Sequence, residues 1–541
     1  MLEVYDRVIP SRSLPTLVAL FLLFAGLYIF SGLLDILRTR IMARVAALID
    51  ASLSGRVFAV IAGLPLRTRL TGDALKPVQE LDQIRQFLAG PGPVALFDLP
   101  WMPVYLFICF LLHPLIGWLT AGAMLVLMGL TFLTDLQTRT LTRQAAEAVA
   151  KRNRYGEAAY RNAEALAAMG MLDRAIAQWE DVHSSCVSLQ RGSADIASML
   201  SGISKALRYT VQSATLGLGA YLVIQGDMTG GMIVAASIIV TRALAPVEQV
   251  IANWRNLLAA SQAWQRLSEM FKLFPQEGSR TSIPAPHKSL QVESVFVSPP
   301  GTTRMTVQNV NFRVQAGTVI GVVGPSASGK SSLARVIVGA WPLARGSIRL
   351  DGASLDQWPR EGRGRHIGYM PQSVDLFPGT VAENIARLDS DADDEAIVAA
   401  AQAAGVHDLI VKLPNGYETQ VGNAGMDLSA GQRQRIALAR ALYRDPFLVV
   451  LDEPNSNLDT EGDKALIEAI AKVRERGGIV IVVAHRTSVL SALDLMLVME
   501  NGMAKAFGPR EAVLKGQAAR VSARSQPAPA LKVIEGEGGH S

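Results

Sequence analysis

At 541 residues the chain is too long for a single domain. Half of its residues are apolar, only 18% are charged and the mean hydropathy is positive, which argues against a wholly soluble enzyme and indicates a membrane portion. The net charge of +5 is small for this length and gives no reason to expect nucleic acid as a partner. Cys109 lies in an apolar run and Cys186 in a polar stretch, so we expect neither a disulfide nor a metal cluster.

We predict a transmembrane domain over residues 1–270. Leu14 to Leu34 carries no charge and, at about 1.5 Å per residue, matches one bilayer core. The charge-free run from Leu99 to Thr134 is too long for one span, and His113-Pro114 near its middle predicts two spans joined by a tight turn. Gly226-Asp227 divides the last apolar region into a second hairpin. The five predicted spans cover about residues 14–37, 99–113, 114–135, 206–226 and 228–248.

The positions of lysine and arginine predict the orientation of these spans. The two long polar stretches between spans are rich in both, whereas the two hairpin turns contain neither, so we expect the stretches in the cytoplasm and the turns outside. The alternative is that these arginines only solvate helix faces. Both stretches have helix-favouring compositions, and helices around residues 71–92 and 158–172 are the expected route for mechanical coupling to a cytoplasmic domain.

The remaining chain divides by composition into three parts. Residues 271–289 are rich in Pro, Ser and charge and predict a linker. Residues 290–515 alternate strand-like and helix-like segments, as in an α/β ATPase. Residues 516–541 are polar and end in a Gly-rich stretch, which predicts a disordered tail.

A complete G-x-x-x-x-G-K-S phosphate-binding loop lies between a buried strand and a helix N-terminus. Backbone N–H groups and the helix dipole would both face the phosphates of ATP. Lys330 is expected at the β- and γ-phosphates, and the Ser331 hydroxyl on Mg²⁺. The predicted nucleotide-binding residues here are Gly324, Pro325, Ser326, Ala327, Ser328, Gly329, Lys330, Ser331 and Ser332.

A second apolar strand, from Phe447 to Leu451, ends in Asp452-Glu453. An acidic residue at the end of a buried strand beside a phosphate loop is suited to hold Mg²⁺, and we assign that role to Asp452. Glu453 is then placed to act as general base on the attacking water.

Leu428-Ser429-Ala430-Gly431-Gln432 precedes a helix and resembles the signature loop of the ABC transporter family, usually L-S-G-G-Q. The resemblance implies a helical transmembrane domain of the ABC exporter type, followed by an α/β P-loop nucleotide-binding domain. It also implies a homodimer or a paired half-transporter, in which two ATP molecules lie between two nucleotide-binding domains. Ser429, Gly431 and Gln432 of one chain would then bind the ATP held by the other.

Further members of that family's motif set follow in order. Gln372 resembles the Q-loop glutamine, implied as a ligand of Mg²⁺ and water. Asp459, in Asn457-Leu458-Asp459, resembles the D-loop aspartate, and His485 the switch histidine that contacts the γ-phosphate. The family usually has an adenine-stacking aromatic near the first strand of the domain. Phe296 is the candidate, with core packing as the alternative.

A closer resemblance covers nearly the whole chain and concerns the permease/ATPases of bacterial type I secretion systems, the protease and RTX-protein exporters. These proteins export unfolded polypeptides across the inner membrane together with a periplasmic adaptor and an outer-membrane channel. The form Pro454-Asn455-Ser456-Asn457 is fairly specific to the group. The other matching segments are Val4 to Ser11, Arg85 to Leu88, Phe97 to Trp101, Asn162 to Glu164, Ala168 to Met171, Ser298 to Gly301 and Ala506 to Arg510.

In that group the segment Val4 to Arg7 follows a first transmembrane helix, so the resemblance implies a further span upstream of Met1. Five spans with a cytoplasmic ATPase domain lead to the same expectation, because they place Met1 outside. Two other functions share the motifs. One is export of lipids or small molecules, and the other is a non-pumping or inactive membrane ATPase.

Overall fold

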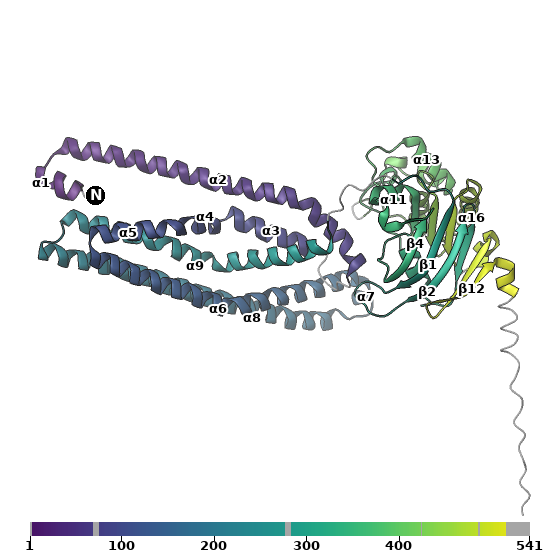
Figure 1. Cartoon of the computed structure of the whole chain (residues 1–541), viewed down its shortest axis with the longest axis horizontal. Coiled ribbons are helices and arrows are strands. Elements are labelled where there is room, and N and C mark those ends of the chain that lie inside the picture. The colour runs from purple at the N-terminus through teal and green to yellow at the C-terminus, as the bar shows by residue number, and fades with distance from the viewer. Residues whose placement is uncertain (1–2, 69–74, 276–282, 423–424, 485–486, 516–541) are drawn as a thin grey trace, which may run out of the picture. The chain divides into compact units, whose positions relative to one another are not determined.

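The computed structural model describes residues 3–68, 75–275, 283–422, 425–484 and 487–515. They form two compact units, and the first ends at Pro275. The first unit is built of long helices and the second of helices and sheets (Figure 1). This is the predicted order of a helical membrane region and an α/β domain. The predicted tail, residues 516–541, lies outside the described residues.

Long helices dominate the first unit, and α2, α6, α8 and α9 each exceed 40 residues. A short helical turn, Val4–Val8, precedes them, and a 3₁₀ turn, Leu99–Trp101, joins α4 to α5. The helices are α1 (Ile9–Ser11), α2 (Leu14–Arg67), α3 (Lys76–Ala89), α4 (Pro91–Asp98), α5 (Met102–Leu112), α6 (Pro114–Arg161), α7 (Ala163–Ala168), α8 (Leu172–Gln225) and α9 (Gly230–Leu273).

Both predicted hairpin turns are confirmed. Between α5 and α6, His113 is extended and its Nδ1 accepts the Leu115 N–H at 3.2 Å, which caps the new helix. Gly226 ends α8 with φ +85°, a left-handed conformation that glycine adopts without strain. Asp6 then caps α9: its carboxylate accepts the Gly231 N–H at 2.9 Å and the Thr229 hydroxyl at 2.6 Å.

Four helical segments of the described chain are long and apolar enough to cross a membrane: α2, Pro91–Leu112, α6 and α9. The predicted span 99–113 therefore belongs to a longer segment that begins at Pro91. The predicted span 206–226 forms the end of α8, which does not reach the same apolar composition, and it stays a prediction.

The predicted linker, residues 271–289, overlaps the neighbouring elements at both ends. Helix α9 continues to Leu273 because Phe271 and Phe274 pack with Val57 and Val60 of α2 in a hydrophobic cluster. Strand β1 begins at Ser289, one residue inside the predicted linker. Part of the linker, residues 276–282, lies outside the described residues.

The first span in α2 has no intramolecular cover, since none of the residues in its most apolar window is buried within the chain. Apolar side chains such as Phe21, Tyr28 and Leu33 are more than half exposed along it. Lipid or the helices of other molecules must cover this surface in the membrane, because an apolar surface of this length is unfavourable in water.

Ion pairs and a hydrogen bond connect neighbouring helices of this unit where charged side chains lie between them. Arg38 of α2 pairs with Asp98 of α4 at 2.8 Å, and Arg266 of α9 pairs with Glu80 of α3 at 2.6 Å. Trp254 of α9 donates its indole N–H to Asp135 of α6 at 3.2 Å. These contacts satisfy groups whose burial alone would be unfavourable.

The described residues of the second unit form three sheets. A six-stranded sheet has the order β12-β11-β3-β10-β9-β6, in which all neighbours are parallel except the edge pair β11–β12. A four-stranded antiparallel sheet has the order β2-β1-β4-β5, and β7 pairs with β8. The strands are β1 (Ser289–Val297), β2 (Val307–Gln315), β3 (Val319–Val323), β4 (Arg345–Leu350), β5 (Ala353–Ser354), β6 (Ile367–Met370), β7 (Gly379–Thr380), β8 (Gln420–Val421), β9 (Leu448–Asp452), β10 (Ile479–Val483), β11 (Leu495–Glu500) and β12 (Met503–Pro509).

Helices cover the six-stranded sheet and build a helical region beside it (Figure 1). They are α10 (Lys330–Ile337), α11 (Arg360–His366), α12 (Val381–Ile385), α13 (Asp394–Ala403), α14 (His407–Val411), α15 (Ala430–Leu442) and α16 (Thr460–Glu475). Strands β9 and β10 are buried along their whole length, which explains their uninterrupted apolar sequences.

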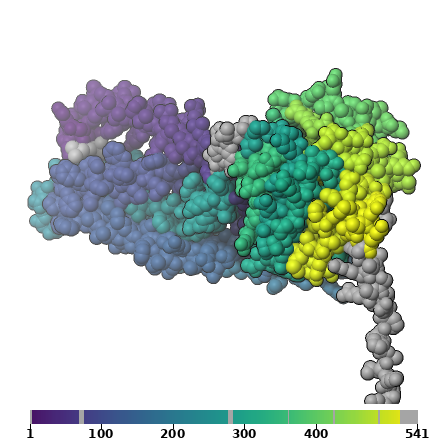
Figure 2. Space-filling view, turned by 45° about the vertical axis from the view of Figure 1, so that its right-hand side comes forward, coloured from purple at the N-terminus to yellow at the C-terminus, as the bar shows by residue number. Residues whose placement is uncertain are grey.

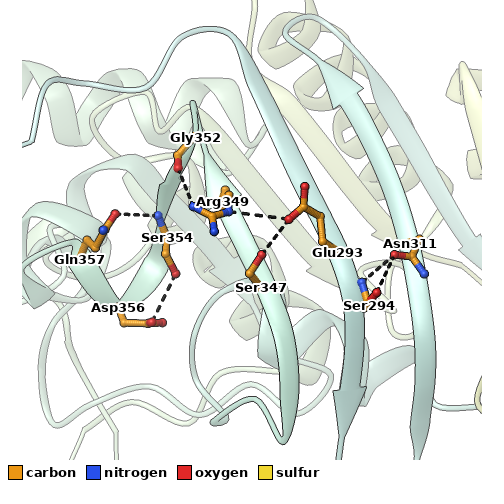
Figure 3. Close-up of polar contacts among 9 residues, drawn as sticks. All are labelled: Glu293, Ser294, Asn311, Ser347, Arg349, Gly352, Ser354, Asp356 and Gln357. Carbon is orange, nitrogen blue, oxygen red and sulfur yellow. Dashed lines mark hydrogen bonds and ion pairs between the residues drawn. The ribbon is translucent and has the colours of Figure 1, made fainter.

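The antiparallel sheet has one apolar and one polar face. Leu290 and Val292 lie in the core, while Glu293 on the other face accepts the Ser347 hydroxyl at 3.0 Å and lies 3.8 Å from Arg349 Nε (Figure 3). At its edge, β2 lies beside the C-terminal strand β12, seen as adjoining teal and yellow surfaces in Figure 2. Buried and more exposed side chains therefore alternate along most of β1, and only one face of the sheet packs against the core.

The ion pair between Glu80 and Arg266 provides a stability prediction. Glu80 is 3% exposed, so Arg266→Met should leave a buried carboxylate without its partner and destabilise the helical unit by about 3 kcal/mol. We expect a lower unfolding temperature in detergent, and recovery in the double variant Glu80→Met/Arg266→Met.

The matched control is Arg191→Met, because Arg191 pairs with Asp195 on an exposed helix surface and should contribute under about 1 kcal/mol. An unfolding temperature for Arg266→Met equal to that of the control would contradict the prediction.

Candidate functional site

The phosphate-binding loop connects β3, which ends at Val323, to α10, which begins at Lys330. Two glycines are required by the backbone. Gly324 has φ +154° and Gly329 has φ +96°. A Cβ on Gly324 would lie 2.1 Å from the Met499 carbonyl oxygen, and one on Gly329 would lie 2.3 Å from that of Thr306. The loop can therefore take this shape only with glycine at both positions.

Lys330 is buried and folds back over its own loop. Its Nζ donates to the carbonyl oxygens of Gly324 at 2.9 Å and Pro325 at 2.8 Å. Burial lowers the pKa of Lys330, while the nearby carboxylates of Glu453 and Asp452 act to raise it. The ammonium group thus lies beside its own loop at the N-terminus of α10, where an anion is favoured.

Ser331 and Asp452 meet as the sequence predicted. The Ser331 hydroxyl donates to Asp452 Oδ1 at 3.0 Å, and Asp452 is fully buried at the end of β9. Burial raises the pKa of Asp452, with the Ser331 hydrogen bond and the Arg335 charge acting to lower it. Its second oxygen, Oδ2, is buried without a hydrogen-bond partner in the described structure.

This donor set fits Mg²⁺. A buried carboxylate oxygen without a partner, next to a hydroxyl oxygen, offers the hard oxygen ligands that the ion prefers. Two protein ligands are sufficient, because Mg²⁺ retains waters and binds phosphate oxygens of the nucleotide.

Glu453 follows Asp452 in a strained conformation. Its φ is +53°, which costs roughly 1–2 kcal/mol for a residue with a side chain. Its N–H donates to the Val483 carbonyl at 3.1 Å, and its Oε2 accepts a hydrogen bond from Gln372 Nε2 at 3.0 Å. Gln372 follows β6, the neighbour of β9, so the ends of adjacent parallel strands bring the two predicted residues together.

The signature loop forms the N-terminus of α15. Ser429 is the N-cap, and a capping box joins it to Gln432: the Ser429 N–H donates to Gln432 Oε1 at 2.9 Å and the Gln432 N–H to Ser429 Oγ at 3.3 Å. Ala430 is the first helical residue, where its methyl group needs no special backbone. A Cβ on Gly431 would lie 2.8 Å from the Asn457 carbonyl oxygen.

Three predicted site residues, Asp459, Phe296 and His485, do not lie with the group around Lys330 and Asp452 in the described structure. Asp459 caps α16, accepting the Gly462 N–H at 2.8 Å, and pairs with Arg435 at 2.5 Å. These contacts, the Gly462 N–H first, lower the pKa of Asp459. Phe296 is half-buried on the polar face of β1 with the Arg345 guanidinium 6.0 Å from its ring centroid, so it is not a core residue. His485 lies outside the described residues.

Sequence reasoning missed Gln434. Its amide bridges α15 to the chain segment after Glu453 and is 2% exposed. The available signal was a glutamine three and four residues before Ala437 and Leu438, which share its helix face and are also buried. Such a residue requires buried hydrogen-bond partners.

Comparisons with known proteins agree with this geometry. Residues 307–456 match the family model described as ABC transporter, and residues 2–244 match that of the ABC transporter transmembrane region. A solved structure of a bacterial Atm1-family ABC exporter with ATP bound superposes with a TM-score of 0.83 over 97% of this chain and 95% of that one. Its 24% identity shows the fold alone.

Curated relatives are similar over nearly the whole chain. The type I secretion system ATP-binding protein PrsD of Rhizobium meliloti (strain 1021) is 53% identical over 99% of this chain and 91% of its own length. The toxin RTX-I translocation ATP-binding protein of Actinobacillus pleuropneumoniae is 30% identical, over 94% and 73%. The leukotoxin translocation ATP-binding protein LktB of Mannheimia haemolytica is 29% identical, over 92% and 71%. The chain therefore belongs to the ABC transporter family, among the ATP-binding proteins of type I secretion systems.

Proposed function

We propose that the chain hydrolyses ATP to export an unfolded polypeptide across the bacterial inner membrane, as the permease/ATPase of a type I secretion system. The observation that carries the proposal is the 53% identity to a type I secretion ATP-binding protein along nearly the whole chain. The site supports it, since the phosphate loop, the buried aspartate and the adjacent glutamate supply the groups that hydrolysis requires.

In the proposed mechanism, Lys330 exchanges its two loop carbonyls for oxygens of the β- and γ-phosphates. Ser331, Asp452 and Gln372 would hold Mg²⁺, which neutralises phosphate charge when bound. Glu453 accepts a proton from the attacking water as general base. His485 would contact the γ-phosphate and stabilise the transition state.

A second copy of the chain completes each site. The N-terminus of α15 presents backbone N–H groups and the positive end of a helix dipole, so the partner's γ-phosphate is a suitable ligand for Ser429, Gly431 and Gln432. Asp459 belongs to the same composite site. The homodimer thus holds two ATP molecules, and their binding closes the two ATPase domains.

Closure would reach the membrane spans through the cytoplasmic segments around residues 71–92 and 158–172, which include α3 and α7. The exported polypeptide would then continue through a periplasmic adaptor and an outer-membrane channel. Cytoplasmic placement of the ATPase domain follows from the arginine-rich stretches between the predicted spans.

Glu453→Gln tests the assignment of the base. The amide cannot accept the proton, so we expect the turnover number to fall at least about 100-fold while MgATP still binds. Steady-state phosphate release and equilibrium nucleotide binding measure the two effects. Glu468→Gln, on the exposed face of α16, is the matched control and should leave both unchanged. Near-normal hydrolysis by Glu453→Gln would refute the assignment.

Ser331→Ala tests the magnesium site. The change removes the hydroxyl beside Asp452, so the Mg²⁺ concentration for half-maximal hydrolysis should rise on the order of tenfold or more. Titration of Mg²⁺ at fixed ATP measures it, and chelation by EDTA should stop hydrolysis in every variant. Ser347→Ala, on the polar face of the antiparallel sheet, is the control. An unchanged Mg²⁺ titration for Ser331→Ala would exclude this ligand.

Affinity purification of the Glu453→Gln form trapped with MgATP tests the export function. We expect a periplasmic adaptor and an unfolded secreted polypeptide to copurify, because the trapped dimer cannot release its complex. Stimulation of the wild-type ATPase by lipid or small molecules, without an adaptor, would instead show a lipid or small-molecule exporter. Hydrolysis without transport into vesicles would show a non-pumping ATPase.

A further inference from the structure

The buried side-chain amide of Gln434 connects the helix that follows the signature loop to the loop that follows the proposed catalytic base, Glu453. Gln434 lies on α15, five residues after the signature serine Ser429, or about 7.5 Å along the helix axis. Its Nε2 donates to the Pro454 carbonyl at 2.7 Å and the Glu453 carbonyl at 3.3 Å. Its Oε1 accepts the Asn457 N–H at 3.1 Å. The amide thus binds the loop after the catalytic base through both its nitrogen and its oxygen.

The Gln434 side chain is 2% exposed, so its amide depends on these protein partners rather than on water for hydrogen bonds. A fourth contact, from Nε2 to Ser456 Oγ at 3.2 Å, lies in the same loop. A buried amide with donors and acceptor both engaged fixes the relative position of two backbone segments, because moving either segment leaves a polar group unsatisfied.

The contact with Glu453 acts on its strained backbone. A residue at φ +53° keeps that conformation only where its surroundings hold it. The Glu453 N–H is held by Val483 in the neighbouring strand β10, and its carbonyl accepts hydrogen bonds from Gln434 and from the Ser456 N–H, each at 3.3 Å. Loss of the Gln434 contact would remove the attachment of this peptide to α15 and allow the direction of the carboxylate to change.

The signature loop touches the same segment through its backbone. A Cβ on Gly431 would meet the Asn457 carbonyl oxygen at 2.8 Å, so the first turn of α15 rests directly against the loop. Helix α15 is therefore attached to residues 453–457 at two levels, by close backbone approach at Gly431 and by hydrogen bonds at Gln434.

We infer that Gln434 is a positioning residue that couples occupancy of the signature loop to the direction of the catalytic base in the same chain. The inference rests on the proposed function, in which the signature loop binds the ATP of the partner chain. A displacement of α15 when that ATP binds is passed by Gln434 to the carbonyl of Glu453. Each chain thereby sets its own base according to the nucleotide in the other site.

Two variants test the coupling in the full-length transporter. Gln434→Leu removes the donors and the acceptor at similar volume. Gln434→Glu keeps the acceptor for the Asn457 N–H but places a carboxylate oxygen against two carbonyls. We expect the turnover number to fall about 10- to 100-fold in both, as misplacement of a catalytic group causes. We also expect the cooperativity of hydrolysis with ATP concentration to be lost.

Binding separates a positioning role from a structural one. In a Glu453→Gln background, MgATP affinity should be the same with and without Gln434→Leu, because the phosphate loop is untouched. Gln402→Leu, on the exposed face of α13, is the matched control and should keep both turnover and cooperativity. Ser456→Ala, which loses one of the contacts, should have an intermediate effect.

The outcomes distinguish this inference from the function on which it rests. Turnover and cooperativity within twofold of wild type in both Gln434 variants would overturn it and leave the proposed function intact. Parallel loss of MgATP binding, turnover and thermal stability in both would also overturn it, by showing that Gln434 only maintains the fold. Unimpaired hydrolysis by Glu453→Gln would instead contradict the proposed function itself.

Discussion

The nucleotide site depends on one buried carboxylate. Asp452 is fully enclosed at the end of β9, and among the described residues only one of its oxygens has a hydrogen-bond partner, the Ser331 hydroxyl. Burial of a carboxylate is unfavourable, and the nearby charges of Arg335 and Lys330 act to offset it. The phosphate loop, β6 and β9 keep the neighbouring groups within reach of this carboxylate.

Much of this arrangement could be predicted from the sequence because its motifs are local. The strand, loop and helix around Lys330 are contiguous, and the order of motifs implied an ABC fold that the comparisons confirmed. The contact between Gln372 and Glu453 spans 81 residues, and its prediction relied on a resemblance. Gln434 was missed because most of its partners are backbone groups, whose positions no sequence pattern reveals.

In the helical unit, too, features set by adjacent residues could be predicted, whereas features set by residues far apart in the sequence could not. Its two tight turns were predicted from His113-Pro114 and Gly226-Asp227, where chain chemistry decides the conformation. The predicted linker overlaps α9 because Phe271 and Phe274 extend that helix by packing against α2, more than 200 residues earlier. The role of Phe296 was left open for a related reason, since its environment depends on Arg345 in the neighbouring strand.

The cap that Asp6 forms on α9 has a consequence for assembly in the membrane. The Gly231 N–H and the carboxylate that accepts it are separated by 225 residues. During synthesis Asp6 must therefore remain without this contact until Thr229 and Gly231 have been made. Contacts of such long range form late, because the intervening chain must first be ordered. The Asp6 cap thus closes the helical unit only after the start of its last long helix has formed.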